Sequence, residues 1–184
     1  MAIKYLKKAI KTPSTDDHET RKVVQEILND LERRREEAIK EISKKFDKYE
    51  GEVVVSKEKI EEANKKVDQK TKDDIQFAHE RIKKFAEHQL KHLNNNFEVE
   101  ISKGLFAGQR LIPIDTVGCY IPGGRYAHIS SAIMAITPAK VAGVKIIITA
   151  SPPKDQNGAN PGIIYAAKYC GADVILNLGG IGAI

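Results

Sequence analysis

The first hundred residues have the hydrophobic and polar pattern of amphipathic helices. Between about residues 17 and 47, apolar side chains recur at steps of three and four, which predicts one long helix. Its apolar stripe consists of Val24, Ile27, Leu28, Leu31, Ala38, Ile39, Ile42 and Phe46. We expect Asp16 and Glu19 to form its capping box and Gly51 to end the element. The short apolar run at residues 53–55 fits either a strand or a packed connector.

Two more helices are predicted before residue 97. Ser56 has the position of an N-cap for a helix that continues to about Asp68, and Thr71 with Asp74 marks the start of another. The asparagines at 94–96 should end this helix, because asparagine favours turns. Its predicted buried face consists of Ile75, Ala78, Ile82, Phe85 and Leu93.

Beyond this helix the pattern changes to strands. Residues 97–102 and 105–114 alternate between apolar and polar side chains, which predicts a hairpin through Lys103 and Gly104. Three short apolar runs rich in β-branched residues then predict buried strands. These runs are residues 117–121, 145–150 and 173–178.

Helical segments separate these three strands. The first follows Ser130 and Ser131, whose hydroxyls we expect to cap it, and Pro138 should restart the helix after Thr137. The second, residues 161–170, begins at a proline and ends before a glycine. Alternating strands and helices predict a parallel sheet, and such sheets bind ligands at the carboxyl ends of their strands. Glycine turns at residues 122–124 and 179–180 follow two of these ends.

The charges divide the chain near residue 104. Residues 1–104 hold 24 of the 30 Lys and Arg and 22 of the 25 Asp and Glu, which leaves only six and three for the rest. We therefore predict a helical N-terminal region at 1–104, a β linker at 105–116, and an incomplete Rossmann-like parallel α/β domain at 117–184. The fold class is α/β.

The charge pattern and composition narrow the function. The net charge is +5, but acids alternate with bases and no stacking aromatics accompany them, so we expect no nucleic-acid partner. There is no apolar run of membrane-spanning length and no charged-then-apolar leader, so we expect a cytoplasmic protein that does not enter a membrane. Cys119 and Cys170 fit reduced thiols, and Cys119 fits either a buried apolar residue or a nucleophile. His88 and His92 fit either solvated side chains or a weak metal pair.

Several motifs occur in a specific order and spacing. They are Val117-Gly-Cys-Tyr-Ile-Pro-Gly-Gly124, Ser130-Ser-Ala-Ile-Met134, Pro138-Ala-Lys-Val-Ala-Gly-Val144, Ser151-Pro-Pro153 and Asn177-Leu-Gly-Gly-Ile-Gly-Ala-Ile184. Together they resemble the histidinol dehydrogenase family, NAD- and zinc-dependent oxidoreductases of histidine biosynthesis. Family members are more than twice as long, so the chain resembles their N-terminal portion.

The resemblance implies roles for individual residues. Tyr120 matches the tyrosine that contacts NAD in the family, and the Pro-Gly-Gly after it is identical. Gly182 stands where the family has a glutamine that contacts the cofactor. Ser130 matches a serine near the substrate pocket, although it fits a helix cap equally well. The cofactor-binding residues expected here are thus Tyr120, Pro122, Gly123, Gly124 and Gly182.

Arg125 departs from typical histidinol dehydrogenases, which have small residues after the glycines. The pattern Gly124-Arg-Tyr-Ala-His128 is similar to relatives that oxidise other alcohols, including dihydroxypropanesulfonate. A guanidinium pairs well with a sulfonate, so Arg125 and Ser130 are the expected substrate-binding residues. Arg125 fits a surface or interdomain ion pair equally well.

The reaction that the resemblance implies is oxidation of L-histidinol through the aldehyde to L-histidine, with NAD and zinc. The family's zinc ligands and catalytic residues lie beyond the equivalent of Ile184, so we expect no catalytic or metal-binding residue here and no turnover by this chain alone. A family member that oxidises another alcohol, or a non-catalytic scaffold that binds a partner chain, are the alternatives. We expect a homodimer or larger oligomer, because the edge of the last strand should be unpaired.

Overall fold

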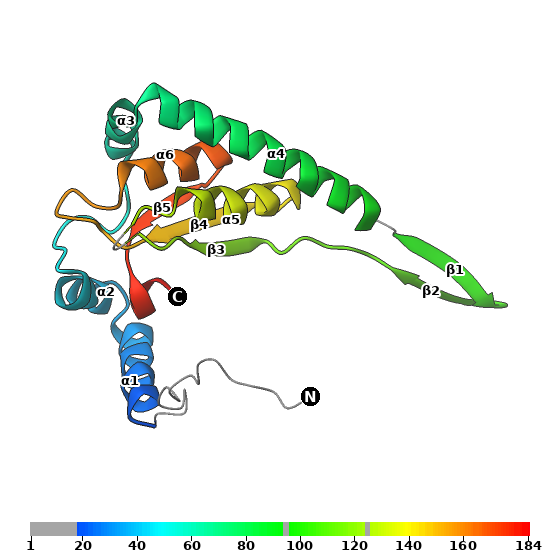
Figure 1. The fold of residues 1–184 in the computed structure, drawn as a ribbon. Coiled ribbons are helices and arrows are strands. Elements are labelled where there is room, and N and C mark those ends of the chain that lie inside the picture. The colour runs from blue at the N-terminus through cyan, green and yellow to red at the C-terminus, as the bar shows by residue number, and fades with distance from the viewer. Residues whose placement is uncertain (1–17, 94–95, 124–125) are drawn as a thin grey trace, which may run out of the picture.

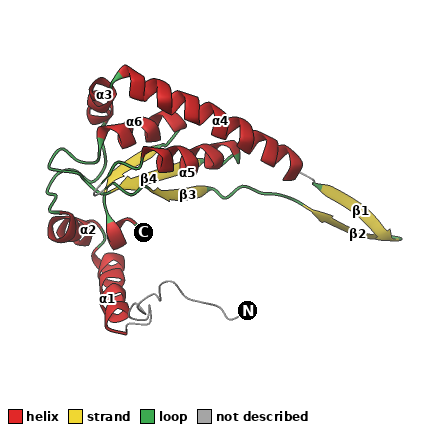
Figure 2. Cartoon of the chain, in the orientation of Figure 1, coloured by secondary structure: helices red, strands yellow, loops and turns green. Residues whose placement is uncertain are grey.

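The computed structural model describes residues 18–93, 96–123 and 126–184. Figures 1 and 2 show a small sheet with helices stacked on one side, two further helices on the other side, and a hairpin that projects from one end. The helices and turns are α1 His18–Arg34, α2 Glu36–Ile42, η1 Ser43–Asp47, α3 Lys57–Lys66, α4 Gln69–Leu93, α5 Ile129–Val141, α6 Pro161–Cys170 and η2 Gly180–Ala183. The strands are β1 Phe97–Ser102, β2 Leu105–Gln109, β3 Thr116–Tyr120, β4 Ile146–Ser151 and β5 Val174–Asn177.

The main sheet has the strand order β3-β4-β5, and all its strands are parallel. The connections α5 and α6 pack on the same face of the sheet, and α3 and α4 pack in turn on these two helices (Figure 1). This α/β arrangement of a helical region followed by a parallel sheet confirms the predicted fold class. The core between sheet and helices includes Cys119, Ile121, Ile133, Ile136, Ile147, Ile163, Ile164 and Ile175.

The long helix predicted for residues 17–47 is broken at Arg35. Arg35 has φ 49° and ψ −114°, which separates α1 from α2, and η1 then ends at Asp47, ahead of Gly51. The break turns α2 toward the rest of the molecule, where Ala38 is buried, whereas no residue of α1 is buried. The single-helix prediction was therefore wrong. Asp16 of the predicted capping box lies outside the described residues.

The next two helices follow the prediction with one shift. Ser56 caps α3, because its Oγ accepts a hydrogen bond from the backbone N–H of Lys59 at 3.3 Å. Asp68, rather than Thr71, caps α4: its carboxylate accepts from the N–H of Thr71 at 2.9 Å and from the hydroxyl of Thr71 at 2.7 Å. The start predicted at Thr71 was thus too late.

The buried face of α4 is shorter than its apolar stripe. Ile75 is buried and Ile82 packs against the core, but Phe85 and Leu93 are each 65% exposed. Figure 1 shows the reason, since the far end of α4 extends past α5 and α6 toward the hairpin. Periodicity marks an apolar face without showing whether another element covers it.

The hairpin forms as predicted, with β1 antiparallel to β2, but its second strand ends at Gln109 rather than residue 114. The helix α5 differs more from the prediction. It begins after His128, which makes no side-chain cap, so Ser130 and Ser131 lie inside its first turn. Pro138 neither ends nor restarts α5. A helical proline leaves the carbonyl four residues earlier without its donor, and here that residue, Met134, is 62% exposed to water.

The outer edge of β5 is not free, contrary to the prediction for the last strand. Residues 53–55 run antiparallel beside it: the N–H of Val55 donates to the carbonyl of Ile175 at 2.9 Å, and the N–H of Asn177 donates to that of Val53 at 2.7 Å. Among the described strands of this sheet, β3 therefore has the unpaired edge. Within residues 18–93, 96–123 and 126–184, no helix has the length and apolar character needed to cross a membrane.

Candidate functional site

Two glycine turns meet at the carboxyl ends of the parallel strands. The first follows Tyr120 at the end of β3, and the second follows Leu178 after β5. The backbone N–H of Gly180 lies 3.4 Å from the Tyr120 hydroxyl oxygen and donates to it, which joins the two turns. The end of β4 lies between them, so three strand ends contribute to one edge, where sheets of this type bind ligands.

Gly123 is required by space rather than by backbone conformation. A Cβ at this position would lie 2.6 Å from the Ser151 Oγ and 3.2 Å from the Ile163 Cδ1. The first turn therefore sits directly on the end of β4 and the beginning of α6. Its close approach explains why a glycine follows Pro122 here.

Ser151 places an unused hydroxyl under the first turn. Its side chain is fully buried, and its Oγ has no hydrogen-bond partner among the described residues. Buried hydroxyls in proteins nearly always have a partner, so the Ser151 hydroxyl is an exception, and it lies beneath the turn rather than on its accessible surface. Ser151 belongs to the Ser151-Pro-Pro153 motif of the family resemblance, but no sequence signal marks it as part of the site.

The second turn is held by the helical region. The N–H of Gly179 donates to the Asp47 carboxylate at 3.0 Å, and a Cβ at Gly179 would lie 2.6 Å from the same carboxylate. Because the amides of Gly179 and Gly180 already have partners in Asp47 and Tyr120, the second turn offers fewer free donors to an anion than its glycines suggest. Asp47 gave no sequence signal, since it lies 132 residues from its partner.

Gly182 lies in η2 against the second helix. A Cβ at this position would be 3.2 Å from the Ile42 Cγ2 and 3.4 Å from the Leu178 Cδ1, so a larger residue would have to displace Ile42 slightly. The glycine thus fits the packing of η2 on α2. Its role as a cofactor-binding residue stays a prediction.

The remaining predicted site residues lie near the first glycine turn or outside the described residues. Pro122 is exposed beside Gly123, and Tyr120 is 39% exposed, so its ring is accessible to a ligand. Ser130 is exposed in the first turn of α5, and the cap interpretation does not hold for it because α5 has no side-chain cap. Gly124 and Arg125 lie outside the described residues.

The other candidate groups are structural in character. Cys119 is 6% exposed, and burial raises the pKa of its thiol, which favours the apolar interpretation over a nucleophile. His92 lies on the exposed side of α4 with its Nδ1 2.7 Å from the His88 carbonyl oxygen. Within the described parts of the chain, no three His, Cys, Asp or Glu side chains gather where they could hold a metal ion.

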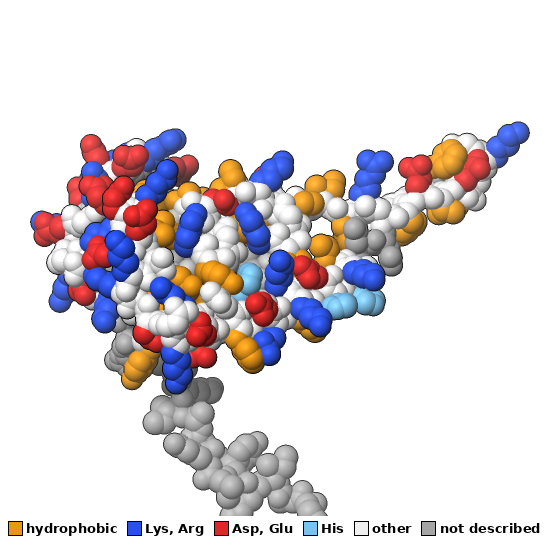
Figure 3. All heavy atoms as spheres, turned by 90° about the horizontal axis from the view of Figure 1, so that it is seen from above, with side chains coloured by type: hydrophobic (Ala, Val, Ile, Leu, Met, Phe, Trp, Pro, Cys, Tyr) orange, Lys and Arg blue, Asp and Glu red, His pale blue; other side chains and the backbone are white. Residues whose placement is uncertain are grey.

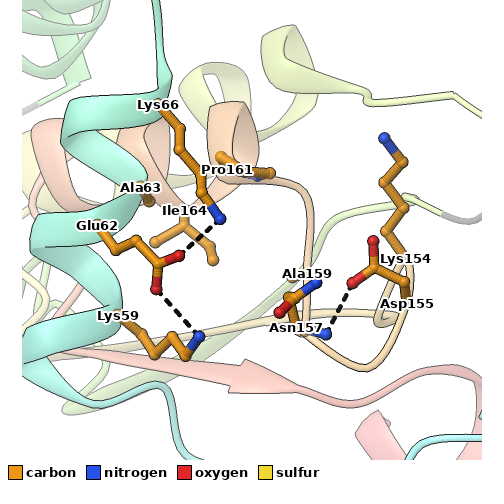
Figure 4. A pocket seen from close by; sticks show the side chains of 11 residues that line it. Lys59, Glu62, Ala63, Lys66, Lys154, Asp155, Asn157, Ala159, Pro161 and Ile164 are labelled. Carbon is orange, nitrogen blue, oxygen red and sulfur yellow. Dashed lines mark hydrogen bonds and ion pairs between the residues drawn. The ribbon is translucent and has the colours of Figure 1, made fainter.

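A separate cavity of about 130 Å³ lies between α3 and the loop before α6 (Figure 4). Glu62 accepts from Lys59 at 3.0 Å and pairs with Lys66 at 2.6 Å, and these two lysines lower the pKa of its carboxyl to about 2. Figure 3 shows the same mixing of acidic and basic side chains over the helical face above it. Three of the charged side chains that line this cavity, Lys59, Glu62 and Lys66, are thus paired with each other, and the glycine turns remain the candidate site.

An open parallel sheet with glycine turns at its carboxyl edge places the chain among α/β proteins, a class in which ligands bind at that edge. Residues 10–184 match the histidinol dehydrogenase family. The chain therefore belongs to the histidinol dehydrogenase family, which confirms the resemblance drawn from its motifs, and the family is one of dehydrogenases.

Individual relatives agree with this assignment. A histidinol dehydrogenase homolog from Pelagibacter ubique is 62% identical over all of this chain and 43% of its own length. A sulfopropanediol 3-dehydrogenase from Ruegeria pomeroyi is 47% identical over 98% of this chain and 41% of its own. The crystal structure of histidinol dehydrogenase from Elizabethkingia anophelis matches with a TM-score of 0.84 and 31% identity, over 93% of this chain and 39% of that one. The chain thus spans about two fifths of the length of these relatives.

Proposed function

We propose that this chain forms the cofactor-binding part of an NAD-dependent alcohol dehydrogenase that works in the cytoplasm. The observation that carries the proposal is the junction of two glycine turns through the Tyr120 hydroxyl and the Gly180 amide, at the carboxyl edge of a parallel sheet. Membership of a dehydrogenase family supports it. Bound NAD would accept the hydride that leaves the alcohol carbon.

The residues at the first turn fit a dinucleotide. The ring of Tyr120 is 39% exposed and offers an apolar face to the cofactor. Gly123 lets the turn beside this ring pack directly on the end of β4. The second turn contributes less, because Asp47 occupies the amide of Gly179. With Gly182 in place of the family's glutamine as well, we expect weak binding with a dissociation constant around the millimolar range, about 4 kcal/mol.

Calorimetric or NMR titration with NAD tests the proposal. We expect Tyr120→Ala to lose most of the response of the wild-type chain, because the ring and the hydroxyl both leave the turn. Tyr169→Ala is the matched control: Tyr169 is equally exposed at 39%, but it packs against His79 on the helical side of the molecule. If Tyr120→Ala and Tyr169→Ala bind NAD alike, Tyr120 does not belong to the site.

The substrate proposed first is L-histidinol, oxidised through the aldehyde, as the family resemblance implies. A sulfonated diol is the second candidate, because the sulfopropanediol 3-dehydrogenase is 47% identical over nearly the whole chain and Arg125 would pair with a sulfonate. Loss of a charge-assisted hydrogen bond typically weakens binding about tenfold or more. Arg125→Ala should therefore weaken calorimetric binding of dihydroxypropanesulfonate and leave histidinol unaffected, whereas equal effects on both ligands would exclude this role.

We propose no zinc-binding residue in this chain, because the described residues contain no cluster of side chains that could hold a metal ion. A scaffold that binds a partner chain without catalysis is the competing function. The NAD titration separates the two, since a scaffold has no reason to retain an affinity that depends on Tyr120.

A further inference from the structure

A segment of the helical region lies across the end of β5. We call residues 47–55 the strap, because they connect η1 to α3 and bond to β5 and to the turn after it. At one end of the strap, Val53 and Val55 pair with the backbone of β5. At the other end, the Asp47 carboxylate accepts from the N–H of Gly179 at 3.0 Å. The strap therefore joins the helical region to the second glycine turn.

The middle of the strap is fixed by a buried amide. Asn177, the last residue of β5, is 4% exposed, and its Nδ2 donates to the Tyr49 hydroxyl at 3.1 Å and to the Glu52 carbonyl at 2.9 Å. Its Oδ1 accepts from the backbone N–H of Ala159 at 2.8 Å. Buried polar groups with all these partners hold their neighbours firmly. These bonds keep the strap on β5 without involving Asp47, so the contact of Asp47 with the turn is a separate one.

Asp47 determines the conformation of the turn itself. A Cβ at Gly179 would lie 2.6 Å from the Asp47 Oδ1 and 2.8 Å from the Pro152 Cβ, so this residue is enclosed on both sides. The next residue, Gly180, has a φ of 53°, which glycine adopts without strain, and its N–H donates to the Tyr120 hydroxyl at 3.4 Å. The contacts thus run in one series from Asp47 through both glycines to Tyr120.

The Tyr120 hydroxyl is sensitive to this series. Among the described residues, the Gly180 N–H is the hydrogen-bond partner of this hydroxyl, and the side chain is 39% exposed. A bond of 3.4 Å is near the upper limit for a hydrogen bond, so a small displacement of Gly180 breaks it. The exposed ring would then be free to change its orientation.

We infer that Asp47 is a positioning residue for the cofactor, which holds the Tyr120 ring in its binding orientation through Gly179 and Gly180. The inference rests on the proposed function, because it concerns the same site. A ring that is already ordered loses less conformational freedom when a ligand packs on it, so the ordered ring binds more tightly. Coupling between two sites is reciprocal, so bound NAD stabilises the contact of the helical region with the turn.

NMR titration of the chain with NAD tests the role of Asp47. Asp47→Ala should weaken binding about fivefold or more, because Gly179 loses its acceptor and the Tyr120 ring its anchor. Asp47→Asn keeps an oxygen that accepts the same bond, so it should bind within about twofold of the wild-type chain. Tyr49→Phe is the matched control, because it removes a bond between the strap and Asn177 but none to the turn. It should lower the melting temperature and leave NAD affinity unchanged.

A double variant separates positioning from a general loss of stability. Tyr120→Phe removes the hydroxyl through which Asp47 acts, so Asp47→Ala should have no further effect on NAD affinity in that background. Unchanged NAD affinity in Asp47→Ala, an equal loss in Tyr49→Phe, or a full effect of Asp47→Ala in the Tyr120→Phe background would overturn the inference.

The contact series can also be followed without the cofactor. In the free chain, Asp47→Ala should shift the resonances of the Gly180 amide and the Tyr120 ring, and Asp47→Asn should keep them near their wild-type positions. Unshifted resonances in Asp47→Ala would show that Asp47 does not position the ring. If these shifts occur but the wild-type chain does not respond to NAD, the proposed function fails while the link from Asp47 to Tyr120 stands.

Discussion

Three glycines in or next to the parallel sheet differ in what surrounds their Cβ positions. Gly123 is confined by the Ser151 Oγ, and Gly179 by the Asp47 carboxylate, whereas Gly118 has open space at its Cβ position. In the sequence all three look like turn or strand glycines. Their roles separate only when the neighbouring atoms are known, and substitution at each should therefore have a different effect.

At Gly123, substitution by alanine should lower the stability of the chain by about 1–3 kcal/mol, the usual range for an atom forced into packed space. Gly118→Ala is the matched control and should be neutral or stabilising by up to about 1 kcal/mol, because alanine costs less conformational entropy in a strand. Thermal unfolding followed by circular dichroism measures both. Ser151→Gly in the Gly123→Ala background should restore part of the loss, and equal melting temperatures of the two single variants would contradict the assigned contact.

At the scale of elements, the break between α1 and α2 is the least expected feature. Arg35 has a positive φ, which residues other than glycine rarely adopt. Its neighbour Arg34 donates hydrogen bonds to Asp30 in α1 and to Glu41 in α2, at distances of 2.5–2.8 Å. These two carboxylates raise the pKa of the Arg34 guanidinium, and the arginine in turn lowers the pKa of Asp30 to about 2. The Arg34 side chain thus spans the break and fixes the angle between the two helices.

Replacing Arg35 by glycine should stabilise the chain by about 1–2 kcal/mol, because glycine adopts this backbone conformation without the strain that a side chain brings. The control is Glu32→Gly near the end of α1. It should lower the stability of the chain by about 1 kcal/mol, because glycine is unfavourable inside a helix. Urea titration of both variants and of the wild-type chain measures the change in the free energy of unfolding. If Arg35→Gly is as destabilising as Glu32→Gly, then α1 and α2 form one continuous helix in solution.

For the molecule as a whole, the exposed side chain of Ile146 in the sheet and the unpaired edge of β3 favour association with other chains. All-parallel sheets normally have both faces covered, yet Ile146 is nearly half exposed in the chain by itself. Exposed apolar patches of this kind favour association. The free edge lies at β3 rather than at the last strand, because residues 53–55 pair with β5.

We expect the purified chain to self-associate into a dimer or larger species. Sedimentation over a range of protein concentrations tests this, and Ile146→Asp should shift the equilibrium toward the monomer by placing a charge at this exposed position of the sheet. A wild-type chain that stays monodisperse and monomeric at high concentration would contradict the expected association.

The sequence by itself determined the parts of the fold whose signals are local. The cap at Ser56, the glycine end of α6, the hairpin and the three parallel strands each depend on residues a few positions apart, so their patterns could be interpreted directly. The burial predicted for the first of these strands was wrong, because only Cys119 of β3 is buried. The same local motifs carried the family resemblance and the assignment of the first glycine turn to the candidate site.

Only the tertiary structure decided which distant residues meet. Asp47 reaches Gly179 across 132 positions, Asn177 donates to the Tyr49 hydroxyl across 128, and Tyr120 accepts from Gly180 across 60. The periodicity of the sequence cannot indicate such pairs, because it reflects only residues a few positions apart. The break at Arg35 and the pairing of residues 53–55 with β5 follow the same rule, because burial against a distant element outweighs the local preference for a longer helix or a loose connector.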